Sequence, residues 1–260
     1  MTIGVHVLKK YHGFLIKNAR AKEVKDWVAA EDTYELYLND TLVDTMVVSP
    51  SDLEDHAVGY VVTEGLVDPG EVADVEQKGP KVTVRTKGEK KIAPSKTLWR
   101  SSAYRGREGV SIPMVTSNIR VSTDLIVRCV KQISEQSESW RKSGGTHISL
   151  LFGRTGRLIK AAEDIGRHNT VDKVVGYALL HHVALNETIL ACSGRQPEGM
   201  VLKIARAKIP IVITKTAVTD KGIEAARRFG VTLIGFAREG RFTLYTHPER
   251  VEIDLSTEWR

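Results

Sequence analysis

Two glycine–arginine pairs stand where an expected strand runs into an expected helix. Gly166-Arg167 follows the segment Leu158 to Ala162, and Gly194-Arg195 follows Thr188 to Cys192. At such junctions glycine lets the backbone approach a ligand, the helix presents free N–H groups, and arginine offers a planar fork for phosphate. Other Gly-Arg pairs occur, so placement before a helix carries the prediction, and a helix start with a surface arginine is the alternative. The predicted anion sites comprise Gly166, Arg167, His168, Asn169, Ser193, Gly194 and Arg195.

Two histidines lie near these junctions. Asp172 comes one helical turn after His168 and is placed to orient its imidazole, as a general acid or base requires. A His–Asp pair that caps the helix explains the same spacing. His147 follows Gly144-Gly145-Thr146, a turn that can hold a ligand closely, although a histidine that opens a strand is commonly structural.

Charge is distributed unevenly along the 260 residues, whose formal net charge is +6. Residues 29–77 contain 13 acidic side chains and no Lys or Arg, whereas residues 78–107 contain ten basic side chains and one acidic one. The basic stretch attracts an anionic partner or pairs with the acidic stretch. It has few aromatic residues to stack on bases and no recognisable binding motif, so we expect no nucleic-acid partner.

Cys129 and Cys192 are the only cysteines, too few for a disulfide framework or a four-thiolate metal site. Cys129 shares a helical face with Leu125, Ile126 and Ile133, so we expect it in the core. The chain shows no signal-peptide core and no run of 18 apolar residues. We therefore expect an intracellular protein without a membrane span.

Patterns in the first half predict a small α+β unit over residues 1–87. Tyr34 to Leu38 and Leu42 to Val48 form a hairpin around Asn39-Asp40. Ser51 to Glu54 has the pattern of a capping box that opens a helix. Two further strands follow, and residues 88–120 are expected to form a basic loop or linker.

From residue 121 to 260, helical and strand patterns alternate. This alternation predicts an α/β domain with a mixed sheet covered by helices on both faces. Ligands of such sheets bind at the carboxyl ends of the strands. The predicted strands are His147 to Phe152, Leu158 to Ala162, Thr188 to Cys192, Pro210 to Thr214, Val231 to Phe236 and Phe242 to Thr246.

Several motifs occur together in an order and spacing that resemble the FdhD family of formate dehydrogenase accessory proteins. The most specific is Asp164 to Lys173, and the resemblance covers about Thr33 to Thr246. The other motifs are Ser49 to Tyr60, Thr63-Glu64-Gly65, Gly144 to His147 and Ser193-Gly194-Arg195.

The resemblance implies a carboxy-terminal domain similar to cytidine deaminase and a cytoplasmic homodimer. It implies binding of the molybdenum (or tungsten) bis-molybdopterin guanine dinucleotide cofactor, for which GDP serves as an analogue. It further implies two partners, a cysteine desulfurase that supplies sulfur and a formate dehydrogenase-type enzyme that receives the cofactor.

In the resembled family, sulfur rides on a loop cysteine within the pattern Ser-Cys-Gly-x-Cys-Gly, because a thiolate accepts a persulfide and releases it by exchange. The matching loop here is Ser101 to Arg107. Ala103, after Ser102, and Gly106 occupy the cysteine positions, so neither thiol is present. The predicted function is therefore cofactor binding, without the loop thiols that sulfur transfer uses.

The resemblance also implies that the turn after Val231 to Phe236 belongs to the guanine-dinucleotide site. A phenylalanine stacks on a flat base, a glycine leaves backbone room and an arginine meets phosphate. The alternative is an ordinary hairpin turn with a core phenylalanine. The predicted residues are Phe236, Ala237, Arg238, Glu239, Gly240 and Arg241.

Three alternatives remain from the residues. The first is an active sulfurtransferase that uses Cys192, which lies at a strand end before an anion site that lowers the pKa of a thiol. A regulatory nucleotide-binding module is the second. The fold resemblance suggests a zinc deaminase, and His247-Pro248-Glu249 matches H-x-E, but the required P-C-x-x-C is absent and no metal site is expected.

Overall fold

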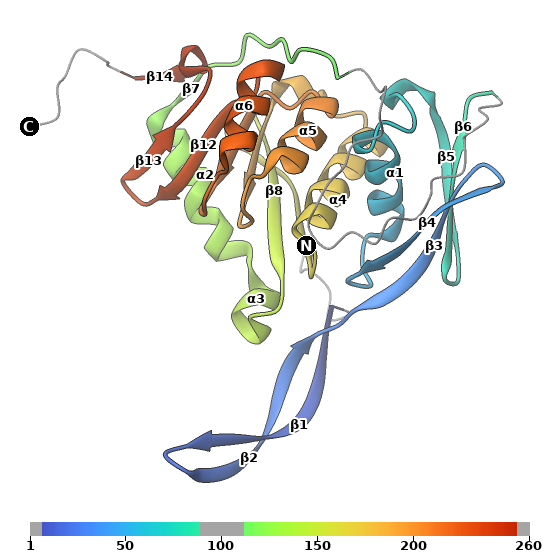
Figure 1. The fold of residues 1–260 in the computed structure, drawn as a ribbon, viewed down its shortest axis with the longest axis vertical. Helices are drawn as coiled ribbons and strands as arrows, with labels where there is room; N and C mark the ends of the chain where they lie inside the picture. The colour runs from blue at the N-terminus through green and yellow to red at the C-terminus, as the bar shows by residue number, and fades with distance from the viewer. Residues whose placement is uncertain (1–6, 89–111, 254–260) are drawn as a thin grey trace, which may run out of the picture.

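The computed structural model describes residues 7–88 and 112–253 (Figure 1). A six-stranded sheet has the order β13-β12-β11-β10-β8-β9. β10, β11 and β12 run parallel, and the other neighbours pair antiparallel. The expected mixed sheet is confirmed. Its strands are β8 (His147–Gly153), β9 (Leu158–Asp164), β10 (Thr188–Cys192), β11 (Ile211–Thr214), β12 (Thr232–Arg238) and β13 (Arg241–Leu244).

Helices cover both faces of this sheet, as predicted. α4 (Arg167–Leu180), α5 (Glu198–Arg206) and α6 (Asp220–Phe229) bury one apolar core against it, and α2 (Thr123–Gln136) buries another on the opposite face. Cys129 is fully buried in the second core, which confirms its predicted place. The remaining short elements are α3 (Glu138–Ser143), η2 (Pro69–Glu71), η3 (Leu185–Glu187), η4 (Pro248–Arg250), β7 (Val121–Ser122) and β14 (Val251–Glu252).

The amino-terminal unit contains a four-stranded sheet in the order β4-β3-β6-β5. The predicted hairpin is confirmed, with Asn39 in the left-handed region at a φ of 52°. The helix α1 (Leu53–Thr63) is also confirmed, but the predicted capping box is wrong. Asp52 makes no side-chain capping bond and instead pairs with Lys160 at 2.7 Å. The strands are β3 (Asp32–Leu38), β4 (Thr41–Val48), β5 (Val72–Lys78) and β6 (Lys81–Thr86).

The two helices α1 and α4 touch through their backbones. A Cβ on Gly59 would lie 1.8 Å from the carbonyl oxygen of Asp172, and one on Gly176 would lie 1.7 Å from that of Asp55. Only glycine permits this approach, because any side chain would force the helices apart. The contact fixes the amino-terminal unit against the helical layer of the large sheet.

A long hairpin precedes the four-stranded sheet and was not predicted. β1 (Leu8–Lys17) and β2 (Arg20–Ala29) extend away from the body of the molecule (Figure 1). Its turn residues Asn18 and Ala19 both have positive φ, as the common two-residue hairpin turns require, but the Asn-Gly signal is missing. Within the described residues, no helix has the length and apolar character needed to span a bilayer.

Candidate functional site

The predicted segments meet at one edge of the large sheet, where the parallel strands end. The end of β10 lies beside the residue that follows β11, since Lys215 donates its backbone N–H to the carbonyl of Cys192 at 3.2 Å. Phe236, in β12, donates to the carbonyl of Thr216 at 2.9 Å. The carboxyl ends of β10, β11 and β12 thus form a continuous edge, the usual place for a ligand in such a sheet.

The two glycine–arginine pairs contact one another. A Cβ on Gly194 would lie 2.8 Å from the Cβ of Arg167, and one on Gly166 would lie 2.7 Å from Nδ2 of Asn169. These glycines therefore make room for side chains of the protein itself. The glycines were predicted to leave room for a ligand, so their observed role differs from the predicted one. The two pairs are neighbours, as expected.

The arginines of these two pairs lack anionic partners among residues 7–88 and 112–253. Neither Arg167 nor Arg195 forms an ion pair there, and the buried Nε of Arg167 has no hydrogen-bond acceptor. Burial, and then the charge of Arg195, lower the pKa of Arg167. Two guanidinium groups that repel each other, one with a buried unsatisfied donor, form a place where an anion is stabilising.

His147 lines a cavity and lies close enough to both arginines to feel their charges. Its Nδ1 is 3.2 Å from Oγ of Ser193, which itself accepts the backbone N–H of Ile148 at 3.0 Å. Because that oxygen already accepts one bond, its own proton is free to be donated to His147. Burial, and then Arg167, lower the pKa of His147, with Arg195 acting in the same direction. The imidazole is therefore neutral at pH 7.

The cavity beside His147 has a volume of about 420 Å³. Trp140 of α3, Ile133 of α2 and Ile165 supply apolar surface, and Ser193 and Lys215 supply polar groups. Sequence reasoning missed Lys215, although its position directly after β11 matches that of Ser193 after β10. It also missed Trp140, because α3 is too short to show a periodic pattern.

Phe236 stands on the same edge and is not a core residue. Its side chain is 46% exposed, its φ is 51°, and the pairing of β12 with β13 shifts register between Gly235 and Arg238. The alternative of a core phenylalanine is therefore wrong. A non-glycine residue held in the left-handed region is uncommon and often marks a functional position.

The rest of this turn is divided between the protein and solvent. Arg238 donates from Nη1 to the carbonyl of Lys215, while Ala237 is buried. Glu239 and Arg241 are exposed, and Gly240 has a φ of 81°, as the tight return into β13 requires. Arg241 is thus the freer of the two arginines.

The predicted pairing of His168 with Asp172 is wrong. Both oxygens of Asp172 accept from Nζ of Lys203, at 2.9 and 2.8 Å, and Oδ1 also accepts from Thr63 at 2.6 Å. Burial lowers the pKa of His168 to about 3, with Lys203 acting in the same direction, and its buried Nε2 has no partner among the described residues. His168 is a neutral, half-buried histidine.

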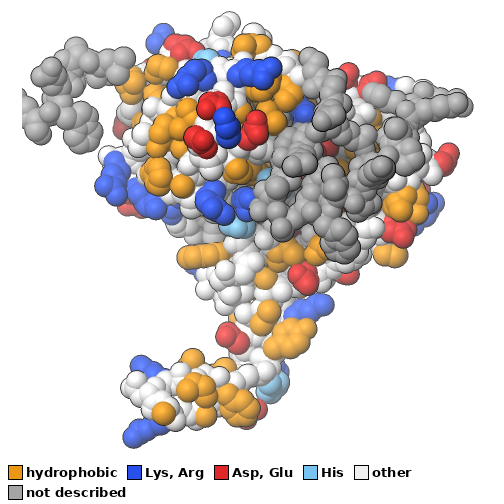
Figure 2. Space-filling model, viewed as in Figure 1, with side chains coloured by type: hydrophobic (Ala, Val, Ile, Leu, Met, Phe, Trp, Pro, Cys, Tyr) orange, Lys and Arg blue, Asp and Glu red, His pale blue; other side chains and the backbone are white. Residues whose placement is uncertain are grey.

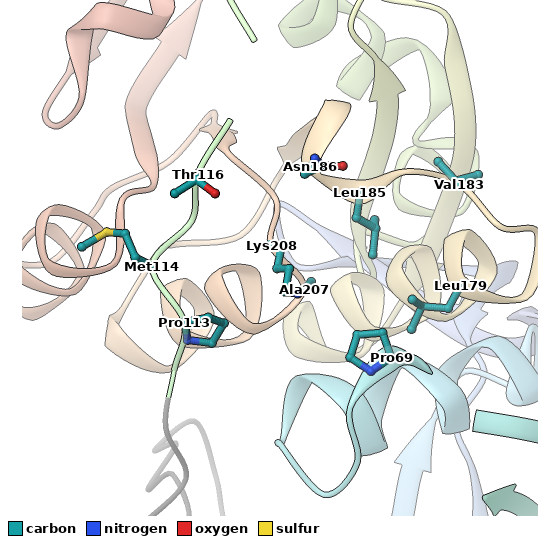
Figure 3. A pocket seen from close by; sticks show the side chains of 10 residues that line it. All are labelled: Pro69, Pro113, Met114, Thr116, Leu179, Val183, Leu185, Asn186, Ala207 and Lys208. Atoms are coloured by element: carbon teal, nitrogen blue, oxygen red, sulfur yellow. The ribbon is translucent and has the colours of Figure 1, made fainter. Parts of the chain in front are cut away.

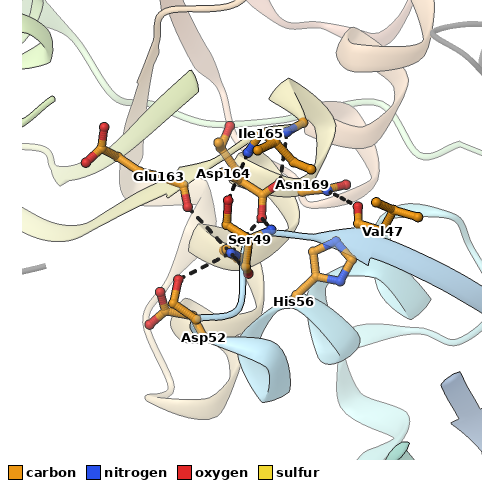
Figure 4. Close-up of polar contacts among 12 residues, drawn as sticks. Val47, Ser49, Asp52, His56, Glu163, Asp164, Ile165 and Asn169 are labelled. Atoms are coloured by element: carbon orange, nitrogen blue, oxygen red, sulfur yellow. Dashed lines mark hydrogen bonds and ion pairs between the residues drawn. The ribbon is translucent and has the colours of Figure 1, made fainter. Parts of the chain in front are cut away.

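Much of Asp164 to Lys173 fastens the amino-terminal unit to the large domain (Figure 4). Asp164 accepts the backbone N–H of Ser49 at 2.9 Å and pairs with Lys173 at 2.7 Å, with both side chains fully buried. Lys173 also donates to the carbonyl of Ser49 at 3.1 Å, and Asn169 donates to that of Val47 at 3.0 Å. Lys203 makes a second fastening through Glu64, at 2.9 Å. We call these contacts the junction.

Neither cysteine is accessible. Cys192 is 1% exposed, and burial raises its pKa to about 12, with its sulfur accepting from Gln196 at 3.3 Å. Burial likewise raises the pKa of Cys129 to about 12. A reactive thiol needs a lowered pKa and exposure, so the structure opposes the sulfurtransferase that uses Cys192. Ser102, Ala103 and Gly106 lie outside the described residues.

Two other features lie apart from this edge. A larger cavity of about 510 Å³ lies near Leu179, at the opposite end of α4 from Arg167 (Figure 3). It is lined mainly by apolar residues, and neither His147 nor Ser193 lines it. Nδ1 of His247 contacts Glu249 at 3.0 Å. In the described parts of the chain no group of three or more potential metal ligands occurs.

The family of the chain follows from comparison with known proteins. The FdhD/NarQ family model matches residues 29–252, and the chain belongs to this family. The resemblance drawn from the motifs is thus confirmed. The sulfur carrier protein FdhD of Methanothermobacter thermautotrophicus is 32% identical over 233 residues, which are 88% of this chain and 93% of that protein. That of Sulfurisphaera tokodaii is 32% identical over 252 residues, 94% of this chain and 99% of that protein.

A solved structure has the same fold. The crystal structure of a formate dehydrogenase accessory protein from Desulfotalea psychrophila matches with a TM-score of 0.79 and 26% sequence identity. The match covers 94% of this chain and 99% of that chain. The α/β fold with its amino-terminal unit is therefore that of the family.

Proposed function

We propose that this protein is a formate dehydrogenase accessory protein that binds the molybdenum or tungsten bis-molybdopterin guanine dinucleotide cofactor as its cargo. The observation that carries the proposal lies at the carboxyl ends of β10, β11 and β12, which we call the strand-end edge. There Arg167 and Arg195 have no anionic partner among the described residues, and a cavity of about 420 Å³ lies next to them. An exposed aromatic side chain, Phe236, stands on the same edge. Family membership supports the accessory role.

Each part of the edge suits one part of such a cargo. The guanidinium groups of Arg167 and Arg195 suit phosphate, for which they offer several parallel donors. Phe236 suits the flat face of a guanine, and Trp140 at the rim of the cavity offers a second aromatic surface. The neutral His147 and Ser193 suit polar atoms of a bound ring. The cargo brings the metal and its pterin dithiolenes, and the chain supplies binding and orientation.

The burial of both cysteines supports a role without a persulfide on this chain. Sulfur carriage requires a thiolate that a cysteine desulfurase can reach, and Cys129 and Cys192 are buried with raised pKa values. We propose that the protein holds and delivers the cofactor in the cytoplasm, as a homodimer, and that any sulfur comes from a partner. The recipient is a formate dehydrogenase-type enzyme.

Calorimetry with GDP tests the binding proposal. GDP supplies the base and the diphosphate of one end of the cargo, so saturable binding below the millimolar range is expected. No heat of binding at millimolar GDP would overturn it. Mass spectrometry of the ligand retained by freshly purified protein separates a pterin cargo from a plain nucleotide, which would instead support a regulatory nucleotide-binding module.

Thiol labelling tests the rival sulfurtransferase. Native protein treated with iodoacetamide at pH 8 should gain no mass, whereas protein unfolded in guanidinium should gain two labels, because both thiols are then exposed. Incubation with a cysteine desulfurase and labelled cysteine should leave Cys192 without a persulfide. A persulfide at Cys192 would establish the sulfurtransferase instead.

A further inference from the structure

The hairpin formed by β1 and β2, which we call the arm, exposes large apolar side chains. Phe14 and Ile16 of β1 are 73% and 62% exposed, and Leu15 between them is 56% exposed. Figure 2 shows orange and blue side chains together on this hairpin. An isolated two-stranded hairpin is marginally stable in water, and exposed apolar patches mark interaction surfaces. The arm therefore has the properties of an element that binds another surface.

The outer half of the arm, residues 14–23, has one apolar face and one basic face. Residues that pair directly across two antiparallel strands share a face, and successive residues alternate between faces. The apolar face carries Phe14, Ile16 and Ala21, all of them exposed. The basic face carries Leu15, Lys17, Arg20 and Lys22. None of these three basic side chains forms an ion pair with a residue of the described chain, so their charges are available to a partner.

The chemistry of both faces favours a protein as the partner. Glu23 stands directly opposite Phe14 on the apolar face, where its Oε1 is 3.3 Å from Nδ1 of His12. Acyl chains offer a carboxylate no hydrogen bond, so this charge opposes burial of the apolar face in a lipid layer. The basic face of the outer half has no aromatic side chain to stack on a base, which opposes a nucleic acid. A protein surface supplies polar groups next to apolar ones and suits both faces.

The root of the arm lies at the rim of the candidate site. β2 packs against α3, where the ammonium group of Lys142 lies 5.8 Å from the ring centroid of Trp27. A Cβ on Gly145 would come within 2.8 Å of that of Ala29 in β2. Gly145 and Trp140 of α3 both line the cavity of about 420 Å³. The arm therefore starts at the wall of that cavity and extends past α3, away from the body of the molecule (Figure 1).

The position of this root selects the recipient of the cargo among protein partners. An enzyme that takes the cargo from the cavity must face its opening. Because the arm projects from the rim of the same cavity, a recipient in that place lies against the arm. Residues 8–29 contain six basic side chains and two acidic ones, and a basic surface of this kind attracts an acidic one across an interface.

We propose that the arm is the docking element for the formate dehydrogenase-type enzyme that receives the cargo. It lies in a groove of that enzyme, with the apolar face of the arm against an apolar wall and the basic face against an acidic wall. Each strand of the arm has ten residues and spans about 33 Å, long enough to enter such a groove while its root stays at the cavity. The inference rests on the proposed function and adds the surface through which the recipient reaches the site.

Binding kinetics provide the first test, with the apo form of a formate dehydrogenase-type enzyme from the same organism immobilised on a sensor. The wild type should bind it, and Phe14→Ser/Ile16→Ser should bind about tenfold or more weakly, mainly through faster dissociation, because apolar anchors are lost. Leu42→Ser/Val47→Ser is the matched control, since these side chains are 46% and 53% exposed and lie outside the arm, and it should bind as the wild type does. No binding by the wild type, or equal affinity of the wild type and the arm variant, would overturn the docking proposal.

Charge reversal provides the second test. Lys17→Glu/Arg20→Glu should associate with the same enzyme more slowly than the wild type, and added salt should reduce this difference. Lys131→Glu/Lys221→Glu makes the same change of charge at two side chains that are each 62% exposed and lie outside the arm. Equal association rates for the two charge variants would contradict an acidic wall.

Further measurements on Phe14→Ser/Ile16→Ser separate this docking from other uses of the arm. Light scattering should show the same oligomeric state for the variant and the wild type, and neither should float with phosphatidylglycerol vesicles. A changed oligomeric state would assign the arm to a second copy of the chain, and flotation of the wild type alone would assign it to a membrane. Either result would overturn the docking proposal.

Calorimetry with GDP separates failure of the docking proposal from failure of the proposed function. The wild type and Phe14→Ser/Ile16→Ser should bind GDP equally, because the substituted side chains lie outside the cavity. Absence of GDP binding by the wild type would overturn the proposed function. Normal GDP binding by a variant that also binds the enzyme normally would overturn the docking proposal alone.

Discussion

The junction and the strand-end edge are both rich in charged side chains, yet they use them in opposite ways. At the junction, Lys173 and Asp164 are fully buried, and each charge meets an opposite charge or a backbone group. At the edge, Arg167 and Arg195 lie close enough to oppose each other's charge and have no anionic partner in the described chain. The most specific motif, Asp164 to Lys173, contributes to both regions.

This difference separates the side chains that determine the structure from those available to a ligand. Buried charges are tolerated only when paired, so the paired set holds the two units in one arrangement. Unpaired like charges weaken the folded state slightly, and their presence at strand ends is consistent with an anion that completes them. Position within a specific motif is therefore a poor guide to role, and the bonding of each side chain is a better one.

The largest effect is expected at the junction. Lys173→Met leaves the carboxylate of Asp164 buried without its counter-charge, and breaking a buried pair in this way costs about 3–5 kcal/mol of unfolding free energy. Urea denaturation should show a lower midpoint. Lys221→Met, which removes an exposed pair with Glu224, is the control and should leave the midpoint unchanged. Equal urea midpoints for the two variants would show that the junction does not stabilise the folded protein.

At the edge, the expected effect is on affinity and not on stability. Arg167→Ala and Arg195→Ala each remove a charged hydrogen bond to phosphate, which contributes about 1.5–3 kcal/mol, so GDP should bind about tenfold or more weakly. The urea midpoint should stay near that of the wild type, because neither side chain has an ion pair to lose in the described structure. Unchanged affinity in both variants would place the ligand elsewhere.

The order of helices and strands from β3 onward could be predicted because apolar residues recur with clear helical or strand periods. The hairpin of β1 and β2 could not be predicted, because Phe14, Leu15 and Ile16 are consecutive apolar residues and show no alternation with polar ones. The strand-end edge followed from the rule for parallel strands. The roles of Asp172 and Lys173 did not, because their partners Thr63, Lys203 and Ser49 are distant in sequence and only tertiary packing joins them.

A smaller effect separates strain from binding at Phe236. Phe236→Ala and Phe236→Gly should both lose base stacking and weaken GDP binding. They should differ in stability, since a left-handed backbone costs an L-residue about 1 kcal/mol that glycine avoids. The glycine variant should therefore melt above the alanine variant while binding equally weakly. Equal melting temperatures would contradict the strain, and full affinity in both variants would contradict the stacking.

The smallest expected effect is proton uptake by His147 when GDP binds. In the free protein, burial and the charges of Arg167 and Arg195 lower the pKa of His147. A bound phosphate offsets the two arginine charges, so the pKa should rise in the complex. Between the two pKa values the complex holds more protons than the free protein. The contribution of His147 to the affinity for GDP should therefore increase as the pH falls between the two pKa values, and it should be absent above them.

The phosphate of GDP also titrates, with a pKa of about 6, so the wild type alone does not isolate the effect of His147. His147→Asn keeps a polar side chain beside Ser193 and removes the titration. Calorimetry in two buffers of different ionisation enthalpy should show greater proton uptake by the wild type than by His147→Asn, by less than one proton. The ratio of the wild-type affinity for GDP to that of the variant should also increase as the pH falls from 7.5 to 5.5, by less than about tenfold per pH unit. Identical proton uptake in the two proteins would show that His147 does not face the bound phosphate.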